Sequence, residues 1–573
     1  MPSKTINLAI LAVLTAIILV VSARQLSVGG LSWSDAPLHT MDGVFIHDLL
    51  IEHPTGDLKN WAKQFYLKHQ CLGIVVYYPP LFAAVEAVVF LTIGVSIVAA
   101  RLTVLLFVIG AVWLIYWLTR RLFGTSAGIA AAILTLTTTA GVTWSRIVML
   151  EWPATFFILL TLWAYRQYRE NPRWIDGILI ALGIAGSYFT KQTAVFVLLV
   201  ILLHVIMDKR RRDIYRRSLL IPMITALLLI GVYAVATAGY NKLAPQLIAG
   251  SPPFRHLISF DNWIWYIREL PGIIGWPMLI GLILAGITIL ATSIKSPKDS
   301  QVSQNNKERT QIHKRNISLP VIWFCLWWLI CTVFAANETR YFFFAVPPAA
   351  ILVATGLLRL DGQRRLGIGS LLLIVLCSIQ TVTAVLETTY RLPNMQPTVE
   401  FLARQNDADL VLVDAVRDGQ FIFDVRTTPQ ARNRIIPMRA SKFLYSRAAR
   451  TKYDYQAHIN NRQELIAWLD QLGIRYLVIE DRLPITTDRS ADPPPRIMLR
   501  QTLQEKQQFE PVFSQSLAGN HPHWQKVNLV TYRYLNAKTR RSNTITIRIP
   551  AMGKELSFTL PTPDSQPVKT NQY

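Results

Sequence analysis

Acidic and basic side chains gather in a few short polar segments of this chain. Asp35, His39 and Asp42 follow one another at intervals of four and three residues. If Ser34 or Asp35 caps a helix and Pro37 lies in its first turn, all three side chains share one face. A carboxylate held there could act as a general base, or Asp35 could serve only as a helix cap. A metal site is a further alternative, although the spacing is not diagnostic of one.

The other polar residues with possible chemistry lie at the ends of apolar runs. Glu151 precedes Trp152-Pro153 at an expected helix start, where it could simply complement the helix dipole. Arg340 lies at the expected start of a helix, where the helix dipole is unfavourable for a cation. We therefore expect an anion such as a bound phosphate beside it. Arg146 and Lys191 are placed to receive an anion in the same way, and contact with lipid headgroups is the alternative for all three cations.

The elements that must carry these residues are membrane helices. The chain has 573 residues, 52% of them hydrophobic and only 16% charged, whereas a soluble domain is about a quarter charged. This composition excludes a soluble enzyme and a disordered protein, and four cysteines argue against a disulfide scaffold. The net charge of +23 comes largely from short loops between apolar runs, which is typical of cytoplasmic loops rather than of a nucleic-acid-binding surface. We therefore expect no nucleic-acid partner.

Apolar runs predict about eleven membrane spans. The first run, residues 6–23, is interpreted as an uncleaved helix rather than a signal peptide, because many spans follow it. Every second loop is basic, which places the N-terminus inside and the C-terminus outside. Residues 80–98 are apolar enough to cross, but a crossing there would turn all the later basic loops outward. We therefore interpret 80–98 as a re-entrant or interfacial segment.

Two regions extend outside this bundle. The first outer loop, residues 25–78, contains Leu58, Trp61, Phe65 and Tyr66 at helical spacing, which predicts an interfacial amphipathic helix or, alternatively, a surface helix on the tail. Hydropathy falls after about residue 390, so we divide the chain into a membrane domain, 1–390, and a soluble α/β domain, 391–573. The tail is expected to contain buried strands at 410–416 and 476–480, a helix at 463–472 ending at Gly473, and later strands within 524–535 and 544–560.

The predicted topology places the candidate site residues on the outer side, near the membrane surface. A transporter more often holds ionisable groups at the midplane. A carboxylate base, several outward cations and aromatic side chains favour transfer of a sugar from a lipid-linked phosphate to a hydroxyl or amine. A transporter or flippase of lipid-linked sugars remains the alternative. No Walker or Rossmann motif is present in the sequence.

Residues along the membrane domain carry a resemblance to a known family. The landmarks are Trp33-Ser34-Asp35, Tyr78-Pro79-Pro80-Leu81, Ala100-Arg101-Leu102, residues 120–124, residues 146–153, Thr190-Lys191, residues 338–341 and Pro347-Pro348. In this order they resemble the C-type polytopic glycosyltransferases (GT-C). The branch is that of the bacterial relatives of dolichyl-phosphate-mannose–protein mannosyltransferase and lipid A aminoarabinose transferase. The resemblance covers about residues 5–390.

The resemblance implies a GT-C helical bundle and an inverting transferase that uses a polyprenyl-phosphate sugar donor. It implies that Asp35 is the catalytic base and that Glu151 is a second acid near the sugar or acceptor. Lys191 and Arg340, joined by Arg146, would bind the donor phosphate. The remaining candidates would line the substrate site: His39, Asp42, Tyr77, Tyr78 and Tyr341.

The partners implied are the lipid donor, membrane lipids and a lipid, glycan or protein acceptor, in what is expected to be a bacterial cytoplasmic membrane. No cofactor is assigned, and a divalent metal is an open possibility. Three departures from the family pattern concern the donor more than the reaction. Asp35 is followed by Ala36 rather than by a second acid, Tyr78 stands where Lys or His is frequent, and Glu151 replaces the usual Asp.

Overall fold

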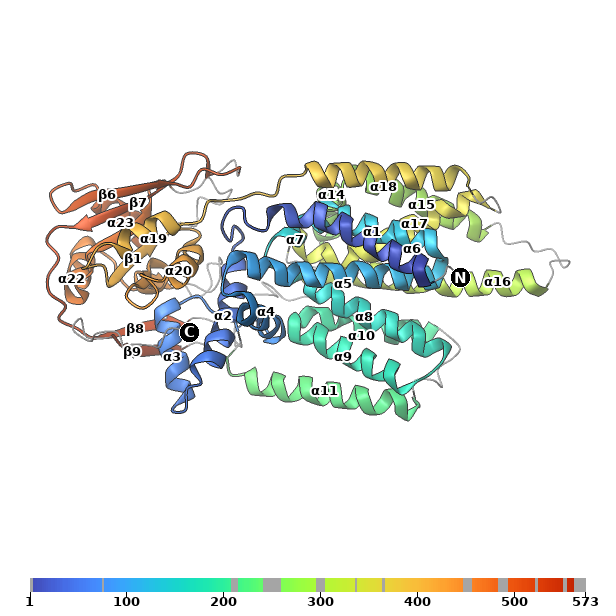
Figure 1. The fold of residues 1–573 in the computed structure, drawn as a ribbon, viewed down its shortest axis with the longest axis horizontal. Coiled ribbons are helices and arrows are strands. Elements are labelled where there is room, and N and C mark those ends of the chain that lie inside the picture. The colour runs from blue at the N-terminus through green and yellow to red at the C-terminus, as the bar shows by residue number, and fades with distance from the viewer. Residues whose placement is uncertain are drawn as a thin grey trace.

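The computed structural model describes residues 4–74, 77–207, 215–240, 259–294, 304–334, 337–362, 366–446, 456–482, 493–520, 524–549 and 554–560. The basic segment 209–212, most of the loop 240–270 and the last dozen residues, about which the sequence also carries expectations, lie wholly or largely outside these ranges. The described chain forms an elongated helical bundle with a mixed α/β domain at one end (Figure 1). The mainly helical fold class with a C-terminal α/β domain is thereby confirmed.

Apolar helices run back and forth along the bundle (Figure 1). Their bounds are α1 Lys4–Ser22, α5 Ile97–Phe123, α6 Thr125–Thr137, α7 Thr139–Arg146, α8 Glu151–Glu170, α9 Trp174–Thr190, α10 Val197–Met207, α11 Arg217–Thr237, α14 Phe260–Ile274, α15 Trp276–Ile294, α16 Gln304–Phe334, α17 Val346–Leu358 and α18 Ile368–Leu386. By length and composition, six segments of the described chain can cross a membrane, and up to eight if each of two bent helix pairs counts as one span. The chain is thus a multi-pass membrane protein, and the number eleven stays a prediction.

The segment between α1 and α5 stays at one end of the bundle. It contains α2 (Ala36–Glu52), α3 (Leu58–His69) and the short α4 (Leu81–Ile93), which packs against α2. Arg101, in the second turn of α5, donates hydrogen bonds to the carbonyls of Leu26 and Gly30, just beyond α1. The end of α1 and the beginning of α5 therefore lie together, as expected if the apolar run 80–98 adds no crossing.

The α/β domain is built on a five-stranded sheet in the order β2-β1-β5-β7-β6. The strands are β1 Leu410–Asp414, β2 Ile436–Arg439, β5 Tyr476–Glu480, β6 Phe509–Ser516 and β7 Asn528–Tyr534, with β2, β1 and β5 parallel and β7 and β6 antiparallel. Both expected buried strands are confirmed, as is the helix α22 (Arg462–Leu472), which ends at Gly473 in the left-handed conformation. The region 544–560, where later strands are expected, forms a hairpin of β8 (Thr544–Ile549) and β9 (Lys554–Thr559).

Helix α3 joins the two domains. Phe65 is buried in the core of the bundle, whereas Leu67 is buried in the core of the tail. The ring of Tyr66 stacks on Phe558 of β9, with 6.3 Å between their centroids. The amphipathic helix expected here is confirmed, and one of its faces belongs to the tail, as in the alternative interpretation.

The tail also packs directly on α2. Helix α20 (Asp418–Thr427) contacts α2, and Arg426 donates to the Asp48 carboxylate with an Nε–Oδ2 distance of 3.0 Å. A Cβ at Gly419 would come within 2.7 Å of Cβ of Pro37, so this contact leaves no room for a side chain. The helix that begins at Asp35 is therefore held by the membrane domain on one side and the tail on the other.

Candidate active site

Asp35 and Arg340, 305 positions apart in the chain, form an ion pair. Asp35 occupies the N-cap position of α2, but its side chain makes no capping hydrogen bond and turns to Arg340 instead. Arg340 is the second residue of the 3-10 helix η4 (Thr339–Ala345), and its Nε also lies 2.5 Å from Oε2 of Glu338. Two carboxylates thus supply the anionic partner that the position of this cation requires.

The neighbours of Asp35 set its protonation state. Burial alone would raise the pKa of the Asp35 carboxyl, but the Arg340 guanidinium, with His39 and the Tyr78 hydroxyl, holds it below its ordinary value. Asp35 is therefore a carboxylate at neutral pH. While it remains paired with Arg340, its lowered pKa makes it a weak base.

A second acid–cation pair lies beside the first. Nζ of Lys191 donates to Oε1 of Glu151 over 2.8 Å, and the Glu151 side chain is fully buried. Glu151 starts α8 and Lys191 follows the last residue of α9, so each charge is at the favourable end of a helix dipole. The ammonium lies over the rings of Tyr341 and Phe344, 5.3 and 5.5 Å from their centroids.

His39 and Tyr78 connect the two pairs. Their rings meet with centroids 4.4 Å apart, and His39 interacts electrostatically with Asp35, Glu151 and Lys191. Burial lowers the pKa of His39 to about 4, so the imidazole is neutral at pH 7. The structure therefore brings seven of the candidate residues together, and we call them the acid–base cluster: Asp35, His39, Tyr78, Glu151, Lys191, Arg340 and Tyr341.

Two candidates for the substrate lining lie outside this cluster. Oδ1 of Asp42 accepts hydrogen bonds from the backbone N–H groups of Gly73 and Ile74 at 2.8 and 2.9 Å, so Asp42 holds the loop that leads to Tyr78. Burial raises the pKa of Asp42 to about 7. Tyr77 is an electrostatic neighbour of Arg439 in the tail. Spacing along α2 could not reveal that a loop captures Asp42.

Arg146 is also placed away from the acid–base cluster, and its contact with the donor phosphate stays a prediction. Its guanidinium donates to the carbonyls of Val21, Ala384 and Glu387 over 2.7–3.0 Å. These carbonyls end or follow α1 and α18, where helices leave acceptors without partners. All three guanidinium nitrogens of Arg146 have acceptors, and these acceptors belong to two helix ends. Arg146 therefore joins the end of α1 to the end of α18.

Sequence reasoning missed several residues at the site. Glu338 lies in the polar stretch that drew attention to Arg340, yet its role as a second carboxylate partner was not foreseen. Trp327 donates from Nε1 to the Tyr341 carbonyl over 2.8 Å, and its apolar surroundings gave no signal. Glu86 of α4 is fully buried beside Gly43, and neither carboxyl oxygen has a hydrogen-bond partner among the described residues. Glu86 could have been found from the sequence, because a single acidic residue within an apolar run is a candidate functional residue.

The chemistry of the acid–base cluster suits an anion better than a metal ion. Each of its two cations faces an aromatic ring and a carboxylate that a phosphate could replace. Within the described ranges, no group of three or more His, Cys, Asp or Glu side chains could hold a metal ion.

Comparisons with known proteins agree with this architecture. Residues 78–236 match the family model described as dolichyl-phosphate-mannose-protein mannosyltransferase. The chain is similar to the crystal structure of ArnT from Cupriavidus metallidurans bound to undecaprenyl phosphate, with a TM-score of 0.54 and 11% identity over 94% of this chain and 100% of that one. The apo form of the same protein gives a TM-score of 0.55 at 11% identity over 91% and 97% of the two chains.

A second similar fold is archaeal. The oligosaccharyltransferase AglB from Archaeoglobus fulgidus, in complex with an inhibitory peptide and a dolichol-phosphate, has a TM-score of 0.51 and 12% identity over 93% of this chain and 74% of that one. No curated protein matches the chain. At these identities the solved structures show the fold, and with the family match they confirm the resemblance of this chain to the GT-C glycosyltransferases.

Proposed function

We propose that this protein is an integral membrane glycosyltransferase that moves a sugar from a polyprenyl-phosphate donor to an acceptor at the outer face of the membrane. The observation that carries the proposal is the meeting of two acid–cation pairs, Asp35–Arg340 and Glu151–Lys191, at the end of the bundle that faces the α/β domain. Displacement of a lipid phosphate from a sugar uses both a base and an anion-binding site, and these two pairs can supply them at this end of the bundle.

The reaction is a single displacement with inversion. Asp35 accepts the proton of the acceptor hydroxyl or amine while the acceptor atom bonds to the anomeric carbon of the sugar. The bond between that carbon and the phosphate oxygen breaks, and the electron pair leaves with the polyprenyl phosphate. Arg340 and Lys191 stabilise the negative charge that develops on this leaving group.

Donor binding also activates the base. In the structure Arg340 is engaged by the Asp35 carboxylate, which holds the pKa of Asp35 low. A donor phosphate competes for the same guanidinium, so its arrival releases Asp35 and raises the pKa of the carboxyl toward its ordinary value. Asp35 thereby becomes a better base only when the leaving group is in place.

The other members of the cluster position the reactants. Glu151, fully buried and bound to Lys191, directs the ammonium toward the phosphate and can accept a hydrogen bond from the sugar or acceptor. Neutral His39 packs against Tyr78 and keeps α2 and the Tyr78 loop in contact. The rings of Tyr341 and Phe344 form a wall beside Lys191.

The comparisons support the class of donor. One similar structure holds undecaprenyl phosphate and another holds dolichol-phosphate with a peptide. We carry the polyprenyl phosphate over to this chain and leave the acceptor as a lipid, glycan or protein hydroxyl or amine. We further propose a bacterial cytoplasmic membrane, with the N-terminus inside and the tail outside.

The test is lipid mass spectrometry on cells that lack this protein. Cells are complemented with wild type, Asp35→Asn or Asp57→Asn at matched membrane levels; Asp57 caps α3 in the same outer loop and is the control. We expect a polyprenyl-phosphate sugar to accumulate, and only wild type and Asp57→Asn to clear it. Full complementation by Asp35→Asn would refute the assigned base and favour a transporter or flippase of lipid-linked sugars.

A further inference from the structure

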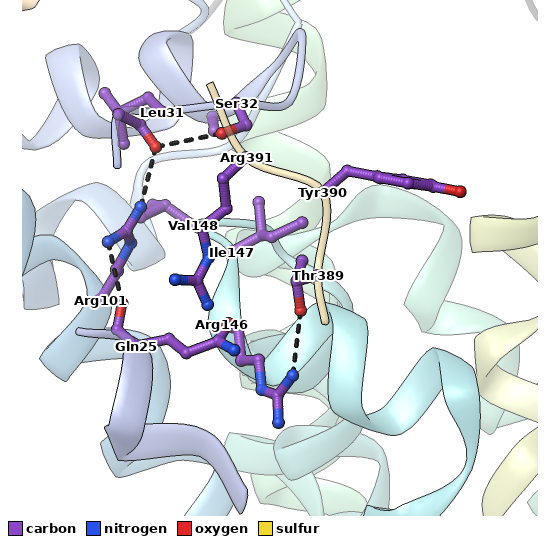
Figure 2. A pocket seen from close by; sticks show the side chains of 12 residues that line it. Gln25, Leu31, Ser32, Arg101, Arg146, Ile147, Val148, Thr389, Tyr390 and Arg391 are labelled. Carbon is purple, nitrogen blue, oxygen red and sulfur yellow. Dashed lines mark hydrogen bonds between the residues drawn. The ribbon is translucent and has the colours of Figure 1, made fainter. Parts of the chain in front are cut away.

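Three arginines surround a pocket where the tail begins, and we call it the arginine pocket. Arg101 comes from α5, Arg146 from the end of α7 and Arg391 from the segment that follows α18. Figure 2 shows the Arg391 side chain reaching toward the other two guanidinium groups. The pocket is a partly open hollow with about 10 Å³ of interior space, and no acidic residue is among those that line it.

Neutral groups hold two of these cations. Arg101 donates five hydrogen bonds to the carbonyls of residues 25, 26, 28, 29 and 30, over 2.8–3.5 Å. Arg146 donates to carbonyls and to the Thr389 hydroxyl. Carbonyl dipoles fix the positions of these side chains but cancel none of their net charge, so the pocket keeps a positive field.

Arg391 has guanidinium N–H groups that are available to bind a ligand. Its backbone N–H donates to Oδ1 of Asn520 over 2.6 Å, but its guanidinium has no hydrogen-bond acceptor among the described residues. It is half-buried and is an electrostatic neighbour of both Arg101 and Arg146. Nε of Arg101 is buried without an acceptor as well. Like charges held this close are unfavourable unless an anion joins them.

The facing charges leave a surplus of cations. Besides the three arginines, Arg24 lies near Arg146, and among the described residues Glu387 is the acid that interacts with Arg146. The acid–base cluster differs, because each of its cations pairs with a carboxylate. The two sites meet at the start of α2: Ala36 lines the arginine pocket, whereas the preceding residue, Asp35, pairs with Arg340.

We propose that the arginine pocket is a second anion site that binds a phosphate group, separate from the acid–base cluster. The donors left there for an anion are the guanidinium of Arg391 and Nε of Arg101, which can form charge-assisted hydrogen bonds to phosphate oxygens, and Arg146 adds its positive charge. The phosphate could belong to a membrane lipid headgroup or be a free ion, since the pocket is at the outer end of the bundle. A phosphate bound there would join the first residues of the tail to α5 and to the loop after α1.

The test is binding by the full-length purified protein and does not depend on catalysis. The melting temperature in detergent is measured in sodium phosphate and in sodium chloride of equal ionic strength, and separately in nanodiscs of phosphatidylglycerol or phosphatidylcholine. The variant is Arg391→Gln, which removes the charge without breaking a described side-chain hydrogen bond. Arg404→Gln, on the exposed surface of the tail, is the matched control.

We expect phosphate to raise the melting temperature of wild type and Arg404→Gln. In Arg391→Gln the apparent Kd for phosphate should rise by about tenfold or more, which is the value of a charge-assisted hydrogen bond, and Arg391→Lys should recover part of the loss. Stabilisation by phosphatidylglycerol that inorganic phosphate competes away identifies a lipid headgroup; a response to inorganic phosphate alone identifies the free ion. An equal response of Arg391→Gln and wild type, or no response of wild type to either probe, overturns the proposal.

Discussion

Arg340 and Arg146 illustrate two ways of holding a buried guanidinium at the same end of one bundle. Arg340 is paired with the carboxylates of Asp35 and Glu338, whereas Arg146 is surrounded by carbonyls at the ends of α1 and α18. A carboxylate side chain can rotate away when another anion arrives, but a helix-end carbonyl is fixed by the fold. The first arrangement therefore permits ligand exchange, and the second fixes the helices while leaving a net positive charge.

The largest effect that distinguishes the two arrangements should come from the partner of Arg340. Asp35→Asn removes the base, so we expect kcat to fall by about 10²–10⁴. Donor affinity should be kept or improved, because Arg340 loses a competitor for the phosphate. Turnover and binding of the accumulated donor lipid in isolated membranes measure both, with Asp57→Asn as the control. A loss of donor affinity with unchanged kcat would mean that Asp35 only organises the site.

Arg340→Gln should abolish much of the stabilisation of the leaving phosphate. We expect kcat to fall by about 10²–10³, the range for loss of one preorganised donor to a developing oxyanion. Arg340→Lys should recover a part of it, because an ammonium restores charge without the guanidinium fork. The same turnover assay at matched protein levels checks this expectation. Normal turnover by Arg340→Gln would leave Lys191 as the sole cation for the phosphate.

Arg146→Gln should instead act on stability. The substitution leaves several carbonyls at two helix ends without donors, and we expect a loss of about 3 kcal/mol in the free energy of unfolding. Thermal unfolding of the purified protein measures the loss, and Arg404→Gln should change it by less than about 0.5 kcal/mol. If Arg146→Gln were as stable as wild type but lost donor binding, Arg146 would resemble Arg340, whose partner can be exchanged for a ligand.

Asp42→Asn should have the smallest effect, and it should depend on pH. The pKa of Asp42 is raised to about 7, so the folded protein keeps a proton that the unfolded chain loses near pH 4. Folding stability therefore falls as pH rises toward and through 7, by about 1.4 kcal/mol between pH 6 and pH 8. Asn keeps an oxygen for the N–H groups of Gly73 and Ile74, so Asp42→Asn should remove this contribution. Melting curves at both pH values measure it; an unchanged slope would mean that Asp42 is ionised throughout.

Local patterns predicted the elements of this molecule well. The strand at 476–480, the helix stopped by Gly473 and the amphipathic helix at 58–69 all follow from periodicity and turn residues acting within a few positions. The pairing of the two strands within 544–559 was not predicted, although Pro550 and Gly553 between them are turn residues. Whether α3 packs on the bundle or the tail depends on partners hundreds of residues away.

The side of the membrane on which each site residue lies was predictable, because the number of crossings alone decides it. Counting basic loops put Asp35, Glu151, Lys191 and Arg340 on one side, and the structure brings them together. The partner of each residue was not predictable, since it depends on side-chain directions at the helix ends. Arg146, like Arg340, was predicted to receive an anion, but the carbonyls around it come from two helices that no sequence pattern links to it.

The short helix α4 has a topological consequence. A segment that leaves and returns on the same side of the bundle adds no membrane crossing. The helices after it therefore begin and end on the same sides of the membrane whether the segment is present or not. The length of this segment can therefore change without inverting the remaining helices. A change in the length of α4 therefore leaves every later helix on its own side, and with it the positions of Glu151, Lys191 and Arg340 at the acid–base cluster.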